Sequence, residues 1–276
     1  MSYKKVLSVQ DISCFGQCSL TVALPIISAC GVETCVLPSA VLSTHTGGFS
    51  GFTFTDLTED MPKIKAHWEK ENILFDCIYT GYLGSKKQID YVKDLFSLLV
   101  NDGVKVVDPA MADNGKLYYG FDEAFAKEMA SLCALSDYCL PNITEACFMT
   151  GVPYKETYDE SYVKLLIEKL CELGCKNLIL TGISYREGKT GVVVYENGKY
   201  SYYEHDKMSK GCHGTGDIYA SAFVGALMNG KSAIDSAKIS ANYVVECIKD
   251  TLTEDNHWYG AKFEPSLYKL IEKVRA

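Results

Sequence analysis

The sequence has no long uncharged hydrophobic run and no cluster of lysine or arginine residues. No uncharged stretch reaches the ~18 residues that a membrane-spanning helix needs, and Asp11 interrupts the start before a signal-peptide core could develop. With a formal net charge of −8, the chain lacks the excess of basic residues that binding to nucleic acid or to an anionic membrane requires. We therefore expect a cytoplasmic protein that binds neither of these.

Histidine is scarce as well, with 5 in 276 residues, and the 12 cysteines form no pair of Cys-x-x-Cys knuckles. A structural zinc site needs such clustered ligands, so we do not expect one. In a cytoplasmic chain, scattered cysteines are most simply small buried apolar residues or free thiols. Internal repeats, low-complexity tracts and Pro/Gly/Ser-rich linkers are absent from the sequence too. We expect one domain over residues 1–276.

What the sequence does contain is a regular alternation of short β-type runs and longer helical patterns. Nearly continuous apolar runs are typical of strands that are covered on both faces. The order of the segments predicts an α/β fold with a central, mostly parallel sheet and helices on both sides. Strands are predicted at 6–10, 34–37, 77–80, 104–107, 138–140, 177–181 and 191–195, and helices at 17–30, 56–71, 86–101, 121–134, 142–150 and 158–173.

The last third of the chain departs from this alternation. Residues 191–203 contain two alternating runs joined by Asn197-Gly198, a strong signal for a β-hairpin. From Thr215 onward the sequence is helical in pattern and rich in small residues. In an open parallel sheet, ligands collect beyond the carboxyl ends of the strands, so candidate functional residues are sought there.

The strongest chemical signal is the segment KGCHGTGDIYASAFVGALMNG, residues 210–230. The backbone N–H groups of Gly214, Thr215 and Gly216, with the positive end of the following helix, can form an anion hole for a phosphoryl group. Asp217 lies in the first turn of that helix, where a carboxylate is stabilised in its ionised form. It can accept a proton from a hydroxyl group that attacks phosphorus. The same four residues are equally compatible with an ordinary helix start.

Further carboxylates follow the predicted strands. Asp108 ends a buried strand and Asp113 comes five residues later, and two such carboxylates can hold Mg²⁺ through water and neutralise nucleotide phosphates. A turn residue with a solvated acid would look the same. Asn142 and Glu145 are three residues apart, so on a helix they face the same way. They are also the residue types of an N-cap and its capping-box partner, and both roles can coexist.

These segments together resemble a known family, the ribokinase-like kinases, and within it the pyridoxal and pyridoxamine kinases. GTGD (214–217) matches the anion-hole and base motif, VVDPAMADNG (106–115) resembles the DPVMGD-type segment, and LPNITEA (140–146) resembles the TPNxxEA segment. VLSVQDISCFGQCSL (6–20), VLSTHTGG (41–48) and TGYLGS (80–85) resemble the segments around the pyridine ring. The matching pieces occur in the family's order from residue 6 to about residue 250.

The resemblance implies a three-layer α/β/α ribokinase-like fold and transfer of the γ-phosphoryl group of ATP to the 5′-hydroxymethyl group of pyridoxal, pyridoxine or pyridoxamine. It also implies Mg²⁺, a monovalent cation and a homodimer, although Leu140 stands where the family often has the threonine of its monovalent-cation site. The implied site residues are the base Asp217; the anion hole Gly214, Thr215 and Gly216; the ATP-binding residues Asp108, Asn142, Glu145 and Thr181; the metal-binding residues Asp113 and Glu145; and the substrate-binding residues Asp11, His45, Thr46, Tyr82 and Tyr118.

Besides Leu140, the chain departs from the family pattern at Asp11 and in the lid segment. Asp11 stands where many pyridoxal kinases have serine. It could pair with a protonated ring nitrogen or an amine, or repel the phenolate of pyridoxal, which favours pyridoxamine or a hydroxymethylpyrimidine as substrate. The lid segment 113–118 is shorter than in longer members. Tyr119 competes with Tyr118 for the role of lid tyrosine. Cys212 and His213 are not expected to act as nucleophiles, because a hydroxyl group can attack phosphorus directly.

Three other functions remain open from the sequence. A hydroxymethylpyrimidine kinase needs the same phosphate machinery, but such kinases usually have cysteine where Asp217 stands. Sugar and nucleoside kinases typically carry more inserted lid strands near the start. A non-catalytic vitamer-binding protein would be expected to lack the acids Asp217, Asp108 and Glu145, all of which are present.

Overall fold

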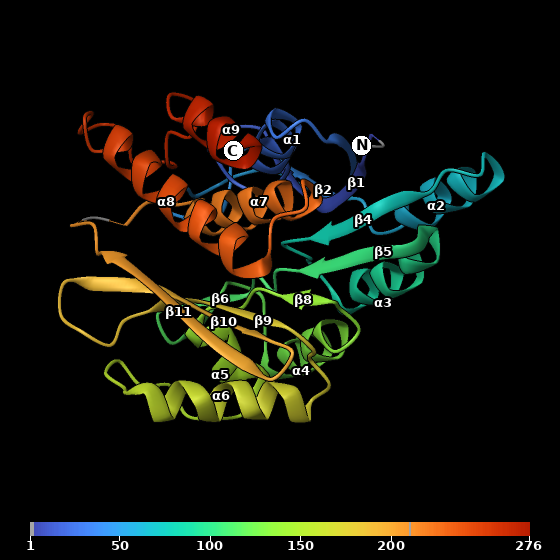
Figure 1. Cartoon of the computed structure of the whole chain (residues 1–276). Helices are drawn as coiled ribbons and strands as arrows, with labels where there is room; N and C mark the ends of the chain where they lie inside the picture. Colours follow the sequence, from blue (N-terminus) through green and yellow to red (C-terminus); the bar gives the residue numbers. More distant parts are fainter. Residues whose placement is uncertain (1–2, 210) are drawn as a thin grey trace.

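The computed structural model describes residues 3–209 and 211–276. Its main sheet has the strand order β11-β10-β9-β8-β5-β4-β1-β2-β3 (Figure 1). Pairing is parallel from β2 through β1, β4, β5 and β8 to β9. Pairing is antiparallel for β3 at one edge and for β10 and β11 at the other. The prediction of a mostly parallel α/β sheet is therefore confirmed.

The strands of this sheet are β1 (Lys5–Ser13), β2 (Glu33–Leu42), β3 (Phe54–Asp56), β4 (Phe75–Thr80), β5 (Leu99–Val107), β8 (Tyr138–Cys139), β9 (Leu178–Ile183), β10 (Lys189–Glu196) and β11 (Lys199–Asp206). A separate small ribbon pairs β6 (Ala112–Asp113) with β7 (Lys116–Leu117). The helices are α1 (Leu20–Ala29), α2 (Met61–Lys70), α3 (Lys86–Leu95), α4 (Glu123–Cys133), α5 (Ile143–Thr150), α6 (Glu160–Glu172), α7 (Thr215–Met228), α8 (Ala233–Thr251) and α9 (Leu267–Arg275), with a 3₁₀ turn η1 (Phe96–Leu98).

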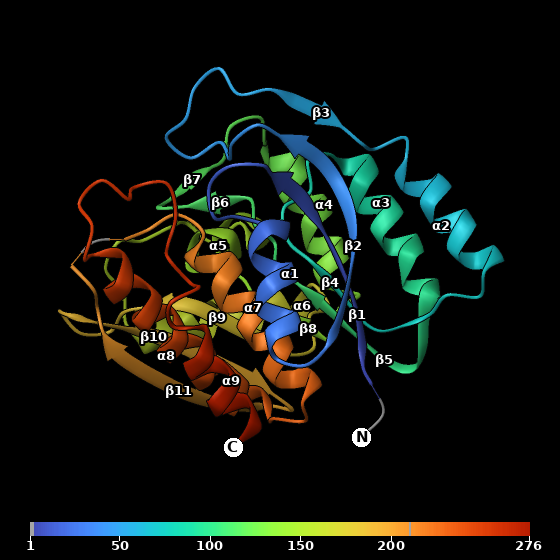
Figure 2. The same ribbon diagram turned by 90° about the horizontal axis from the view of Figure 1, so that it is seen from above.

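Helices cover both faces of the sheet. Figures 1 and 2 show α1, α7, α8 and α9 on one face and α2 to α6 on the other. The central strand β4 shows how the sequence produces this: Ile78 packs into the core beneath α2 to α6, while Cys77 and Tyr79 pack beneath α1 and α7. A strand buried on both faces is apolar at successive positions, which is the pattern that predicted it.

The hairpin predicted from Asn197-Gly198 is confirmed, and it forms one edge of the main sheet. Both turn residues have positive φ, +52° and +78° respectively, as a tight two-residue hairpin turn requires. Seven of the cysteines are buried, as expected for small apolar residues. Within the part of the chain that the structure describes, no helix has the length and apolar character needed to cross a membrane.

Two predicted helices are wrong at their ends. The helix predicted over 86–101 ends at Leu95, and Leu99 already begins β5, where it pairs with Phe75 of β4. The apolar residues at 98–100 continue the helical spacing in the sequence, but Leu99 and Val100 belong to a strand because they lie beside β4 in the sheet. The helix predicted over 56–71 begins at Met61, and the residues before it include β3 and a turn. Pro62 in the first turn of α2 is compatible with this later start.

Candidate active site

The start of α7 lies against the loop that follows β1. Gly214 precedes the helix with φ +77°, and a Cβ at this position would come within 1.9 Å of the carbonyl oxygen of Gln17. Only glycine allows the two backbones to approach so closely. The Thr215 hydroxyl donates to the carbonyl oxygen of Cys212 at 3.2 Å, which fixes the turn. A Cβ on Gly216 would meet no atom within 4 Å, so the space beside the Cα of Gly216 is open. Lys210, at the start of the segment that predicted it, lies outside the described residues.

Asp217 is placed in the first turn of α7. Burial raises the pKa of its carboxyl group to about 7, while the backbone N–H of Ser19 opposes this shift and the charge of Asp11 adds to it. A carboxylate with a pKa near neutrality is poised to exchange a proton with a bound hydroxyl group.

Asp108 follows the carboxyl end of β5, and its backbone N–H donates to the carbonyl oxygen of Thr80 at the end of β4. Its side chain is buried. Desolvation and the nearby charge of Asp217 raise the pKa of Asp108 well above its usual range. The structure therefore brings together two acids that are 109 positions apart in the sequence (217 − 108).

Asn142 and Glu145 form a complete capping box at the start of α5: the Asn142 side chain accepts from the Glu145 N–H at 2.9 Å, and the Glu145 carboxylate accepts from the Asn142 N–H at 2.8 Å. The same carboxylate also accepts from the Met111 N–H at 3.2 Å. Burial and the charge of Asp108 raise the pKa of Glu145 well above its usual range. Thr181 of β9 bridges to Asn142, so these residues lie in one patch.

Asp113 lies apart from this buried group. It is exposed at the end of β6, and its carboxylate accepts from the backbone and side-chain N–H groups of Asn114 at 2.8 and 2.9 Å. The turn is tied to α5 through the Gly115 N–H, which donates to the Thr144 hydroxyl at 3.1 Å. Asp113 therefore stands at the rim of the site.

The buried acids of the site have no basic partner among residues 3–209 and 211–276. None of the ion pairs found there includes Asp108, Glu145 or Asp217. Across the same residues, no three His, Cys, Asp or Glu side chains converge closely enough to hold a metal ion by themselves. Acids that face one another in this way raise each other's pKa values, and an external cation would relieve that repulsion.

Asp11 lies in β1 and is 4% exposed. Burial raises the pKa of its carboxyl group, and the hydroxyl groups of Ser13 and Ser19 oppose this rise. Tyr82 lies close enough to Asp11 to feel its charge: burial, and after it the negative charge of Asp11, raise the pKa of Tyr82 to about 12. The Tyr82 ring also packs on Phe121, with 5.5 Å between the ring centroids. The structure thus brings together a carboxylate and an aromatic ring that the resemblance assigned to the substrate.

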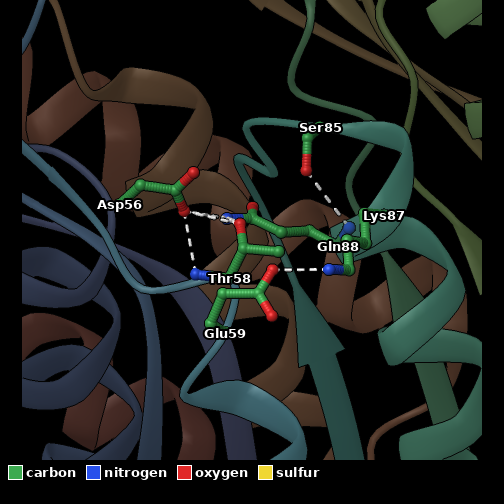
Figure 3. Close-up of polar contacts among 6 residues, drawn as sticks. All are labelled: Asp56, Thr58, Glu59, Ser85, Lys87 and Gln88. Atoms are coloured by element: carbon green, nitrogen blue, oxygen red, sulfur yellow. Dashed lines mark hydrogen bonds and ion pairs between the residues drawn. The ribbon is translucent and has the colours of Figure 1, made fainter.

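A buried glutamine that the sequence analysis did not single out fixes the segment carrying Tyr82. Gln88 of α3 accepts from the Gly84 N–H at 2.7 Å, and its amide donates to the Ser39 carbonyl oxygen at 3.0 Å and the Thr58 hydroxyl at 2.8 Å. Figure 3 shows the amide end of this side chain reaching Asp56 and Thr58. Gln88 therefore ties the segment after β4 to the neighbouring edge of the sheet. The sequence did contain a signal: Gln88 lies four residues before Val92 and seven before Leu95, which places a polar side chain on the apolar face of the helix.

His45 is buried with both ring nitrogens in use. Its Nε2 donates to the Tyr259 carbonyl oxygen at 2.7 Å, while its Nδ1 accepts from the Gly47 N–H at 3.1 Å. Its ring centroid is 5.3 Å from that of His213, directly before the predicted anion hole. His45 thus orders the loop beside the site, and its neighbour Thr46 is exposed.

Tyr118 and Tyr119, the two candidates for the lid tyrosine, differ clearly in their exposure to solvent. Tyr119 is 95% exposed. Tyr118 is 41% exposed. Its hydroxyl group lies near enough to the acids of the site that, after desolvation itself, Glu145, Asp113 and Asp108 all raise its pKa. Its backbone N–H donates to the Met111 carbonyl oxygen at 2.8 Å. Of the two, only Tyr118 faces the acids.

A three-layer α/β/α sheet with an acid-bearing glycine turn at its carboxyl edge places the protein among the small-molecule kinases of the ribokinase-like fold. The family model described as phosphomethylpyrimidine kinase matches residues 24–261, and the chain belongs to this family.

Individual relatives agree with this placement. A Bacteroides thetaiotaomicron protein assigned to the phosphomethylpyrimidine kinases and crystallised with pyridoxal is 37% identical, with a TM-score of 0.91 over 98% of this chain and 96% of that one. Pyridoxal kinase from Lactobacillus plantarum is 27% identical, with a TM-score of 0.91 over 98% of both chains. Pyridoxal kinase from Dictyostelium discoideum is 26% identical over 240 residues, covering 80% of this chain and 77% of that protein.

Proposed function

We propose that the protein is a pyridoxal kinase that transfers the γ-phosphoryl group of ATP to the 5′-hydroxymethyl group of pyridoxal, pyridoxine or pyridoxamine. The observation that carries this proposal is Asp217 at the start of α7, beside a glycine turn open to a phosphate and close to Asp108. The structural relative crystallised with pyridoxal supports a pyridine substrate.

In the proposed reaction Asp217 takes the proton of the 5′-hydroxyl group as its oxygen attacks the γ-phosphorus, and the bond to ADP breaks. The backbone N–H groups from Gly214 to Asp217 stabilise the negative charge on the transferred group. Such a transfer needs little covalent chemistry from the protein, so positioning and charge stabilisation supply most of the acceleration.

The buried acids fit a bound Mg²⁺ together with nucleotide phosphates. Desolvation raises the pKa of both Asp108 and Glu145, the charge of Asp217 adds to the rise at Asp108, and the charge of Asp108 adds to the rise at Glu145. Neither acid has a basic partner among the described residues, which is the environment that a divalent cation stabilises. Oxygen ligands and retained water are what Mg²⁺ prefers. We propose that these two residues hold the ion through its water shell, with Asp113 at the rim and Asn142 and Thr181 towards the phosphates. Bound Mg²⁺ neutralises phosphate charge during the transfer.

On the substrate side, Tyr82 packs on the pyridine ring and Asp11 contacts a cationic group of the vitamer, either the ring N–H or an amine. The hydroxyl of Thr46 bonds a ring substituent, His45 holds that loop, and Tyr118 covers the site. A buried carboxylate favours a substrate that offers it a hydrogen-bond donor or a positive charge, because binding a substrate without one leaves the carboxylate buried and unpaired, which costs free energy. Pyridoxamine is therefore the expected preferred vitamer.

The decisive assay measures ATP consumption by purified protein with Mg²⁺ and, separately, pyridoxal, pyridoxine, pyridoxamine or hydroxymethylpyrimidine. Turnover of a pyridine supports the proposal, and kcat/KM ranks the vitamers. Turnover of the pyrimidine alone would assign the protein to hydroxymethylpyrimidine kinase, the second candidate, which the family description favours. Comparing the rates of parallel reactions in K⁺ and in Na⁺ tests whether the enzyme requires a particular monovalent cation. The molar mass measured by light scattering tests the homodimer that the resemblance implies.

A variant pair tests the base. Asp217→Asn is expected to lower kcat by about 10²–10⁴, the range for loss of a general base. The matched control is Asp235→Asn, because Asp235 is an exposed acid at the same first-turn position of α8. A kcat of the Asp217→Asn variant within tenfold of the wild-type value would reject the assignment of Asp217 as the general base.

A further inference from the structure

The connection between α8 and α9, residues 252–266, lies against two of the loops that carry the proposed site. In Figure 2 it is the long red loop between these helices. The Ala261 N–H donates to the carbonyl oxygen of His213 at 3.0 Å, directly before the turn of the proposed anion hole. The Tyr259 carbonyl oxygen accepts from the His45 ring at 2.7 Å, in the loop after β2. The α8–α9 connection thus contacts the phosphate side and the substrate side of the site together.

Gln17, in the loop after β1, joins the same connection through both ends of its side-chain amide. Its Oε1 accepts from the His257 Nε2 at 3.0 Å, and its Nε2 donates to the two carboxylate oxygens of Glu264 at 2.9 and 2.8 Å. An amide has one acceptor end and one donor end, so glutamine matches a ring N–H on one side and a carboxylate on the other. Both partners lie more than 200 positions away in the sequence.

The backbone of Gln17 is held between two glycines. A Cβ on Gly260 of the α8–α9 connection would come within 2.7 Å of the Gln17 Cβ and 2.9 Å of its backbone nitrogen. A Cβ on Gly214, before α7, would come within 1.9 Å of the Gln17 carbonyl oxygen. Only glycine allows such close approaches of the backbone. Gln17 is therefore packed between the α8–α9 connection and the turn that precedes Asp217.

We infer that Gln17 is a positioning residue, which fixes the turn of the proposed anion hole by linking it to the α8–α9 connection. The inference rests on the proposed function, in which the N–H groups from Gly214 to Asp217 hold the transferred phosphoryl group. The donors of an anion hole contribute most when they are held in place before the reaction. The Gln17 side chain is bonded to His257 and Glu264, so it acts on the reaction only through its backbone contact with Gly214.

The pairing of Gln17 with Glu264 allows the link to be broken and then restored. Gln17→Glu places a carboxylate against the Glu264 carboxylate, and like charges in contact repel each other. In the double variant Gln17→Glu/Glu264→Gln, the new amide donates to the new carboxylate, whose other oxygen still accepts from His257. The exchange therefore restores the wild-type hydrogen bonding with donor and acceptor reversed.

Glu254 provides a matched control, because it is a second exposed acid of the α8–α9 connection. Its carboxylate forms an ion pair with Lys262, and none of the side-chain contacts of residues 3–209 and 211–276 joins it to Gln17. Glu254→Gln removes the same charge from the same segment without reaching Gln17. A recovery caused only by the lower negative charge would appear equally with both acids.

The kinetic test compares Gln17→Glu alone, combined with Glu264→Gln and combined with Glu254→Gln. Gln17→Glu is expected to lower kcat about tenfold, less than the loss of a whole anion-hole donor, while the KM for the vitamer stays within about threefold. Glu264→Gln should return kcat to within about threefold of the wild type, and Glu254→Gln should leave the loss in place. Wild-type kcat in Gln17→Glu, or equal recovery with the two acids, would overturn the inference.

A second substitution breaks the link without adding a charge. Gln17→Ala removes both amide bonds and is expected to lower kcat about threefold, again with the KM for the vitamer nearly unchanged. Glu264→Gln should not rescue this variant, because the alanine side chain offers it no partner. Melting temperatures show that each variant is folded at the assay temperature. A lowered melting temperature with wild-type kcat in both Gln17 variants would mean a structural role alone and would overturn the inference.

The position of the turn can also be measured without substrate. Backbone amide signals of ¹⁵N-glycine-labelled protein are recorded without ligand, and the signals of Gly214 and Gly216 are identified by their loss in Gly214→Ala and Gly216→Ala. Gln17→Glu should shift both signals, and Glu264→Gln, but not Glu254→Gln, should return them towards their wild-type positions. Unmoved signals in Gln17→Glu would overturn the link. Wild-type protein that phosphorylates no vitamer would reject the proposed function instead, and these signals would still decide whether Gln17 positions the turn.

Discussion

The carbonyl oxygen of Gln17 occupies the space where any side chain on Gly214 would have to lie, since a Cβ there would come within 1.9 Å of it. The loop after β1 and the turn before α7 are therefore packed backbone against backbone. The first of these loops carries Ser19, and the second carries the predicted anion hole and Asp217. Their relative position is fixed by a contact that leaves no room for adjustment.

Gly214→Ala is expected to lower kcat/KM by about 10²–10³, as the loss of one anion-hole donor does, because the new methyl group displaces the turn. Positive φ at this position adds strain. The control is Gly211→Ala in the same segment, where a Cβ would meet nothing within 4 Å. Steady-state kinetics with Mg·ATP checks both. Equal activity of the two variants would show that the turn does not hold the phosphoryl group.

Asp217→Asn is expected to make the protein more stable at pH 8 while lowering its activity. The folded-state pKa of Asp217 is raised from 3.8 to about 7, so between those values the folded protein binds more protons than the unfolded chain. The stability of the wild type therefore falls as pH rises through this window. Replacing the ionised group should recover roughly 2–4 kcal/mol at pH 8 and little at pH 4. Denaturant unfolding at both pH values measures this, with Asp235→Asn as the control. A loss of stability at pH 8 would contradict the burial of a charged Asp217.

Much of this architecture follows from local sequence pattern. Asn142 and Glu145 were compatible with both a capping box and a phosphate site, and the structure forms the capping box while placing Glu145 beside Asp108. Local rules act within one turn of helix, so three-residue spacing is enough to predict the cap. The approach of Glu145 to Asp108 depends on the neighbouring positions of β5 and β8 in the sheet, which the α/β order predicts only in outline.

Other features depend on contacts that no local pattern contains. Leu99 was predicted as helix because its apolar neighbours continue the helical spacing, but pairing with Phe75 makes it a strand residue. The same applies to Gln88, whose partners Ser39 and Thr58 are 49 and 30 positions away. Ser19, with φ +57°, forms an isolated bridge to Ile12 of β1 that its own sequence neighbourhood does not show. Sequence pattern locates such residues on an element but does not show what they meet.

Asp108→Asn is expected to weaken the Mg²⁺-dependent part of ADP binding more than Asp113→Asn does. Both acids were predicted near the phosphates, but Asp108 is buried beside Asp217 while Asp113 is exposed and bonded to Asn114. Thermal shift with ADP, with and without Mg²⁺, separates the metal-dependent part, because a ligand that binds only the folded state raises stability. Asp108→Asn should abolish most of the extra shift that Mg²⁺ gives, and Asp113→Asn should keep most of it. The reverse ranking would place the ion at the rim.

Tyr118→Ala and Tyr119→Ala form the last matched pair, since the residues are adjacent and of the same type. Tyr118 lies near Glu145, Asp113 and Asp108, whereas Tyr119 is 95% exposed. Loss of the Tyr118 ring opens the acids to water, which weakens every charge interaction in the site. We expect kcat/KM to fall about tenfold or more in Tyr118→Ala and to stay within about twofold in Tyr119→Ala. Uncoupled ATP hydrolysis, measured without a vitamer, should rise relative to kinase turnover only in Tyr118→Ala. Equal values of kcat/KM and of uncoupled ATP hydrolysis in the two variants would mean that the 113–118 segment does not cover the reacting groups.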